Sequence, residues 1–207
     1  MEGRSGVILP ADRRRLAGLL FLVSGAGLVV HILVGLPLWL TVPGGLLVVS
    51  AALRWVGALT GVNLAPLVRR GVLVGAVATA TYDLSRVLVV EALDLTVRPF
   101  AAWPLFGQAL IGSAAPAWMQ LAAGVAFHLI NGLAFAVAYT AWFATRGVRA
   151  GIAWGLFLET FMLGLYPGWL HIADYGPFLV VSLSGHVVYG AVLGAGARAV
   201  ATREPAA

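Results

Sequence analysis

Residues 117–143, AWMQLAAGVAFHLINGLAFAVAYTAWF, lie between Pro116 and Arg146 and contain no Asp, Glu, Lys or Arg. A transmembrane helix needs about 20 consecutive, predominantly apolar residues. This stretch therefore predicts a membrane-spanning helix. His128 and Asn131 lie within about one helical turn of its centre, where polar side chains are costly in hydrocarbon.

Five further stretches of similar character predict five more spans, with breaks at proline, glycine or arginine. Their approximate ranges are 16–35, 38–60, 71–93, 150–164 and 177–197. The predicted fold class is all-α: a polytopic integral membrane helix bundle with six transmembrane helices, in a single domain over residues 1–207. The composition agrees, because 61% of the 207 residues are hydrophobic and 10% are charged, against about 25% charged in ordinary soluble domains.

The chain has no cysteine. Disulfides, thiolate metal sites and cysteine nucleophiles are therefore excluded.

Residues 94–116, between the third and fourth predicted spans, are interrupted by Pro99, Pro104, Gly107 and Gly112. This pattern predicts an interfacial or re-entrant segment rather than another span. Its aromatic residues, and those of the loop 166–177, suit the headgroup level of a bilayer. The two aromatic segments are expected to lie on the same face, where they could form a lid or a mouth.

The basic residues predict the orientation of the bundle. All 13 are arginine, and the positive-inside rule places arginine-rich loops in the cytoplasm. With both termini in the cytoplasm, most of the arginines fall inside, namely Arg4, Arg13, Arg14, Arg15, Arg69, Arg70, Arg146, Arg149, Arg198 and Arg203. The predicted location is thus the cell membrane, multi-pass, with cytoplasmic N- and C-termini.

Glycines spaced by four residues, such as Gly151 with Gly155 and Gly190 with Gly194, predict close helix packing within the bundle. A homo-oligomer formed through such a face is the minority interpretation. The strings GLVVHILVGL, from Gly27, and GVAFHLINGL, from Gly124, align without gaps. They suggest a weak inverted repeat of residues 16–93 and 117–197, a pattern frequent in transporters with a midplane binding site.

Four ionisable residues sit near the centres of four different predicted spans: Asp83, His128, Glu159 and His186. A charged side chain at that depth costs about 2.5–3.5 kcal/mol on insertion scales, so their common depth predicts a shared polar site inside the bundle. Neighbours on the same helix faces extend the set. The candidate site residues for a ligand or proton are Asp83, Arg86, His128, Asn131, Glu159, His186 and Tyr189.

Two imidazoles and two carboxylates are plausible ligands for a divalent transition metal such as Zn, Mn or Fe. Asp83, His128, Glu159 and His186 would then be the metal ligands. No local motif such as HExxH is present, and two alternatives stay open: a hydrogen-bonded network without metal, and a proton or cation relay. Haem is disfavoured, because the two carboxylates would be poor neighbours for a porphyrin.

The function that this pattern favours is binding or transport of a metal ion, proton or small solute at a midplane site. A membrane enzyme acting on a lipid or isoprenoid is the first alternative, with Asp83 or Glu159 as acid or base and with the histidines polarising the substrate or holding a metal. A structural or assembly subunit is the second. The expected partners are the lipid bilayer and a small solute, ion or lipid, and no nucleic acid.

Overall fold

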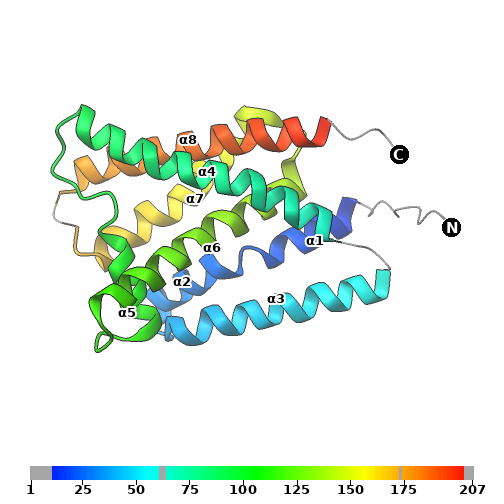
Figure 1. Cartoon of the computed structure of the whole chain (residues 1–207), viewed down its shortest axis with the longest axis horizontal. Helices are drawn as coiled ribbons and strands as arrows, with labels where there is room; N and C mark the ends of the chain where they lie inside the picture. Colours follow the sequence, from blue (N-terminus) through cyan, green and yellow to red (C-terminus); the bar gives the residue numbers. More distant parts are fainter. Residues whose placement is uncertain (1–10, 61–63, 173, 203–207) are drawn as a thin grey trace.

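The computed structural model describes residues 11–60, 64–172 and 174–202, and within these ranges every regular element is a helix (Figure 1). The helices are α1 (Ala11–Leu20), α2 (Val23–Val34), α3 (Leu38–Thr60), α4 (Ala65–Ala92), α5 (Ala102–Ile111), α6 (Ala117–Phe143), α7 (Gly147–Trp169) and α8 (Tyr175–Thr202). The predicted all-α class is confirmed for this part of the chain.

Five helices are long and apolar enough to cross a membrane: α3, α4, α6, α7 and α8. The ends of α3 and α6 coincide with the predicted spans, because Pro37 and Pro116 immediately precede these two helices. The helices α4, α7 and α8 extend beyond the ranges of the corresponding predicted spans. In α7 the chain stays helical past Gly164 to Trp169 despite Pro167, since a proline near a helix end removes only one backbone hydrogen bond.

The first predicted span is not one continuous helix, which corrects the prediction of six. Residues Phe21 and Leu22 form a turn between α1 and α2, with backbone bonds from Phe21 to Gly18 and from Leu22 to Leu19. The two short helices still follow one another from one end of the bundle to the other (Figure 1). A contact with α6 holds α1, because the indole of Trp142 donates to the backbone oxygen of Arg15 at 2.7 Å.

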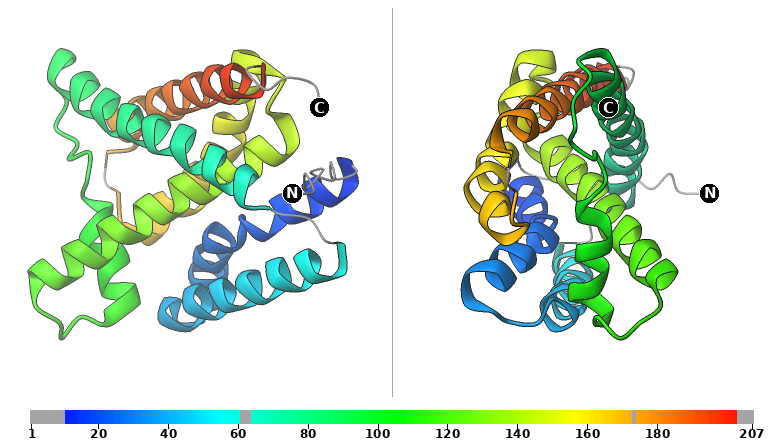
Figure 2. Two further views of the ribbon diagram at one scale, coloured as in Figure 1. Left: turned by 45° about the vertical axis from the view of Figure 1, so that its right-hand side comes forward. Right: turned by 90° about the vertical axis from the view of Figure 1, so that its left-hand side faces the viewer.

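Helix α5 gives the segment between the third and fourth predicted spans its shape. It doubles back along the first half of α6 (Figure 2). The two backbones approach so closely that a Cβ on Gly124 would lie 1.7 Å from the carbonyl oxygen of Trp103. The side chain of Gln120 caps the turn by donating to the backbone oxygens of Ser113 and Ala115. A re-entrant position of α5 in the membrane stays a prediction.

The glycines spaced by four pack α7 against α8 within one chain, as the spacing predicts. A Cβ on Gly151 would lie 2.0 Å from the carbonyl oxygen of Gly190, and one on Gly155 would lie 2.2 Å from that of His186. The close contact fixes the register of the two helices that carry Glu159 and His186.

The arginine-rich helix ends gather at one end of the bundle. Figure 1 shows the start of α1, the start of α4, the α6–α7 junction and the end of α8 at that end, with α5 at the opposite one. Arg15 and Arg146 line a common surface hollow, and Arg198 lies against Gly147. The side of the membrane that this end faces stays a prediction, and the extreme termini, with Arg4 and Arg203, lie outside the described residues.

Candidate ligand-binding site

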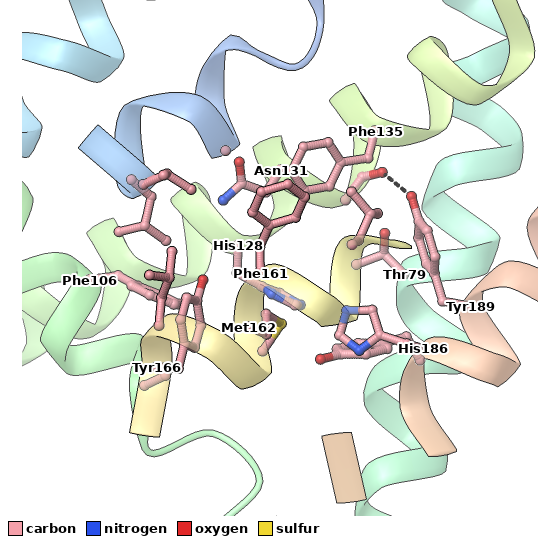
Figure 3. A pocket seen from close by; sticks show the side chains of 18 of the residues that line it. Thr79, Phe106, His128, Asn131, Phe135, Phe161, Met162, Tyr166, His186 and Tyr189 are labelled. Atoms are coloured by element: carbon pink, nitrogen blue, oxygen red, sulfur yellow. Dashed lines mark hydrogen bonds between the residues drawn. The ribbon is translucent and has the colours of Figure 1, made fainter. Parts of the chain in front are cut away.

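A cavity of about 410 Å³ lies inside the bundle, between α2, α4, α5, α6, α7 and α8. Most of its wall is apolar, with Phe106, Phe135, Phe161 and Met162 among the lining side chains (Figure 3). Its volume falls in the range of about 300–1,000 Å³ that is common for small-molecule sites.

The cavity reaches the apolar outer surface of the bundle at α7. Phe157 and Phe161 line the cavity, and they are 47% and 45% exposed. Both side chains therefore contact the cavity on one side and the surroundings of the protein on the other.

Polar side chains gather on one part of the cavity wall, where α4, α6 and α8 meet. Tyr82, Arg86, His128 and His186 all line the cavity. Two carboxylates, Asp83 and Glu159, contact the histidines. These six residues, Tyr82, Asp83, Arg86, His128, Glu159 and His186, are called the polar cluster below.

The first carboxylate–histidine pair is deeply buried between α7 and α8. Oε2 of Glu159 lies 2.8 Å from Nδ1 of His186, and the two side chains are 1% and 9% exposed. The hydroxyl of Ser182 donates to the same carboxylate oxygen at 2.9 Å. Nδ1 of His186 also lies 3.0 Å from the backbone oxygen of Ser182. The imidazole is therefore held in one orientation by two acceptors.

The second pair joins α4 to α6. Nε2 of His128 lies 3.0 Å from Oδ2 of Asp83, whose side chain is 21% exposed. Arg86, one helical turn along α4, approaches Asp83 to 4.0 Å and also donates to the backbone oxygen of Pro99. This pair is thus more open than the first, and its carboxylate has a permanent cation beside it.

Tyr82 lies between the two pairs. Its ring centroid is 5.9 Å from that of His128 and 5.0 Å from that of His186, where the rings meet edge to face. The Arg86 guanidinium lies 5.1 Å from the same ring centroid. The tyrosine therefore separates the two histidines while keeping both on the cavity wall.

The structure brings the sequence-predicted residues together as two pairs rather than one ligand set. No group of three or more His, Asp or Glu side chains in the described ranges is arranged to hold a metal ion. The predicted metal centre is therefore not supported. The physical reason is that each histidine turns a ring nitrogen to its own carboxylate, with Tyr82 between the pairs.

Asn131 and Tyr189, the remaining predicted residues, both line the cavity. The Tyr189 hydroxyl donates to the backbone oxygen of Gly132 at 2.7 Å and so ties α8 to α6 (Figure 3). In the described residues, Oδ1 of Asn131 is buried without a hydrogen-bond partner.

Sequence reasoning missed Tyr82 and the aromatic residues of α5 that reach the site. Trp103 lies 5.4 Å from the His128 ring, centroid to centroid, and also lines the cavity. The signal for Tyr82 was its place beside Asp83 at the centre of a span. No sequence signal placed Trp103 there, because its position depends on α5 folding back along α6.

The fold and the site define a class of protein. Within the described residues it is an all-α helical bundle with five helices able to cross a membrane and a buried Glu159–His186 pair beside an internal cavity. Comparisons of the chain with protein-family models, curated proteins and solved structures found no match.

Proposed function

We propose that this chain is a multi-pass membrane protein that binds an amphiphilic small molecule of the lipid or isoprenoid class. The apolar part of the ligand occupies the cavity, and its polar head lies against the polar cluster. The observation that carries this proposal is the cavity itself: an apolar chamber of about 410 Å³ with polar groups on one part of its wall. An amphiphile has an apolar chain that suits the apolar chamber and a polar head that suits the polar part of the wall.

The wall at Phe157 and Phe161 supports a ligand that arrives from the bilayer. Both rings are exposed on the apolar outer surface and line the cavity. A hydrophobic molecule could therefore pass between lipid and cavity without crossing water. A hydrated ion or a sugar would find mostly aromatic and aliphatic side chains along this route, which costs such a solute its hydration.

An enzyme acting on such a ligand is the second candidate. The observation that favours it is the Glu159–His186 pair, in which a carboxylate orients an imidazole at a cavity wall, as in many general acid–base sites. Analysis of the bound molecule before and after incubation with the protein separates the two candidates: a binding protein returns it unchanged, and an enzyme converts it.

Native mass spectrometry of the protein in nanodiscs tests the proposal. Met162→Trp places a larger side chain in the cavity, and Leu73→Trp adds the same side chain on an exposed face of α4, where Leu73 is 61% exposed. We expect the wild-type protein and the Leu73 variant to carry a bound amphiphile, and the Met162 variant to lose it while remaining folded. Equal occupancy in all three proteins would contradict the proposal.

A further inference from the structure

The contacts of His186 determine which of its ring nitrogens carries the hydrogen. Nδ1 lies within hydrogen-bond distance of Oε2 of Glu159 and of the backbone oxygen of Ser182. A backbone oxygen can only accept a hydrogen bond, so Nδ1 must be the donor. In the neutral imidazole, Nε2 then has a free lone pair.

The free lone pair belongs to a ring on the cavity wall and has no protein partner in the described part of the chain. The His186 ring lines the cavity (Figure 3), and within the described residues no protein group donates to Nε2. The ring cannot turn easily, because Tyr82 packs edge to face against it and both contacts of Nδ1 would be lost. The protein therefore presents a fixed acceptor to whatever occupies the cavity.

Other buried polar atoms at this site are mainly acceptors as well. Oδ1 of Asp83, Oδ1 of Asn131 and Oε1 of Glu159 are buried without a hydrogen-bond partner in the described part of the chain. At the same site, the possible donors Nε of Arg86 and Oγ1 of Thr79 are also buried and unpaired among the described residues. Buried acceptors without partners are costly. Of these three acceptor residues, Asn131 lines the cavity, so a hydrogen-bond donor on the ligand could relieve this cost at Oδ1 of Asn131, whereas a ligand that brings only acceptors could not.

The charge of the polar cluster disfavours an anionic head group. With neutral histidines, two carboxylates face one guanidinium, since Asp83 and Glu159 each contribute a negative charge and Arg86 one positive charge. The cluster then has a net negative charge in an apolar surrounding, where electrostatic effects are large. A carboxylate or phosphate head would add a further negative charge.

We infer that the amphiphile bound in this cavity is a neutral alcohol or phenol whose hydroxyl donates a hydrogen bond to Nε2 of His186. This inference rests on the proposed function, because it specifies the ligand class of the same cavity. Lipid-derived alcohols and isoprenoid alcohols have the required chemistry: an apolar chain and one uncharged hydroxyl.

Three matched probes test the inference in detergent solution at pH 8: a sesquiterpene alcohol, its methyl ether, and the carboxylic acid of the same chain. Dissociation constants are measured by native mass spectrometry and checked by ligand-dependent thermal stabilisation. We expect the alcohol to bind most tightly. The ether keeps the acceptor oxygen and loses the donor, so we expect it to bind about tenfold more weakly. The acid should also bind more weakly than the alcohol.

Variants assign the preference to His186. In Glu159→Gln the backbone oxygen of Ser182 still takes the Nδ1 hydrogen, so the preference for alcohol over ether should persist, while the penalty on the acid should shrink. In Glu159→Gln/His186→Phe the preference for alcohol over ether should disappear. His128→Phe removes the other histidine of the polar cluster and should weaken binding of the alcohol and the ether alike. Leu73→Phe, on an exposed face of α4, is the matched control and should keep the wild-type preference.

Three results would overturn the inference: equal binding of alcohol and ether to the wild-type protein, tightest binding of the acid, or loss of the preference in the His128 variant alone. If Met162→Trp still abolishes binding in these cases, the proposed function stands and only the ligand class is wrong. If none of the three probes binds to the wild-type protein and no amphiphile co-purifies with it, the proposed function itself fails.

Discussion

The two carboxylate–histidine pairs differ in how their charges are compensated. Asp83 is 21% exposed and has Arg86 nearby, whereas Glu159 is 1% exposed and, within the described residues, has no ion-pair partner except His186. A buried charge without a partner is strongly destabilising. The Glu159–His186 pair should therefore be the more sensitive of the two to loss of one member.

We predict that His186→Phe lowers the free energy of unfolding by about 1–3 kcal/mol, because the buried Glu159 carboxylate then loses the Nδ1–H group that bonds it. Glu159→Leu/His186→Phe should recover most of that loss, because the buried carboxylate is then removed together with its imidazole partner. The measurement is reversible unfolding in mixed detergent micelles.

The comparison with His128→Phe provides the control, since Arg86 still compensates Asp83 in that variant. The decrease in the free energy of unfolding should be clearly smaller for His128→Phe than for His186→Phe. If the double variant at residues 159 and 186 were no more stable than His186→Phe, an uncompensated carboxylate would not be the cause of the instability.

At the scale of the helices, close contact between α7 and α8 positions the buried pair. The contact depends on glycine, because any side chain on Gly155 would meet the backbone oxygen of His186 itself. A backbone oxygen cannot move aside as the end of a flexible side chain can. A methyl group at this position must therefore separate the two helices.

We predict that Gly155→Ala destabilises the protein by about 1–3 kcal/mol, the usual cost of overpacking. Gly164→Ala, on the same helix, is the matched control, because a Cβ there meets no atom within 4 Å. It should be neutral, or stabilising by about 0.5–1 kcal/mol through higher helix propensity. Thermal unfolding monitored by circular dichroism measures both.

The same pair of variants distinguishes packing from backbone propensity. Displacement of α7 should also weaken binding of the amphiphile to Gly155→Ala and leave Gly164→Ala unchanged. Equal stability of the two variants would mean that the α7–α8 contact tolerates a wider separation than the structure indicates.

At the scale of the whole molecule, the arrangement of helix ends agrees with an even number of crossings. The start of α1 and the end of α8 lie at the same end of the bundle (Figure 1). The five long helices each pass along the bundle once, and α1 and α2 together make one further pass. An even number of passes brings the two chain ends to the same end of the bundle. Both ends of the described chain should therefore face the same side of the membrane.

We predict that this side is the cytoplasm, from the positive-inside rule. The chain has no cysteine, so a single introduced cysteine reports its own location without background. Ser113→Cys, at the α5 end of the bundle, should react in intact cells with a membrane-impermeant maleimide. Thr202→Cys, at the end of α8, should react only after permeabilisation. Both residues are exposed. The reverse labelling pattern would show that the arginine argument is wrong.

Much of the fold could be predicted from the sequence because its main determinants are local. Apolar length determined the five long helices, and the prolines before α3 and α6 determined where those helices begin. Glycine spacing predicted the close contact of α7 with α8, and the depth of four ionisable residues indicated where polar groups would gather. The break between α1 and α2 escaped prediction, because no proline precedes it and a contact with Trp142 of α6 holds α1 in place. The weak inverted repeat stays a prediction.

Hydrophobic length and residue type are local properties of the chain, so the sequence alone identifies which polar residues lie within apolar helices. The partners of these polar residues depend on how the helices pack against one another. Helix rotation and register turned Asp83 to His128 and Glu159 to His186, placed Tyr82 between the pairs, and folded α5 back so that Trp103 reached the cavity. These pairings depend on side-chain directions across helices distant in sequence, and no spacing within one helix specifies them. The same four side chains could form one metal site or two hydrogen-bonded pairs, and the directions in which they point decide between the two.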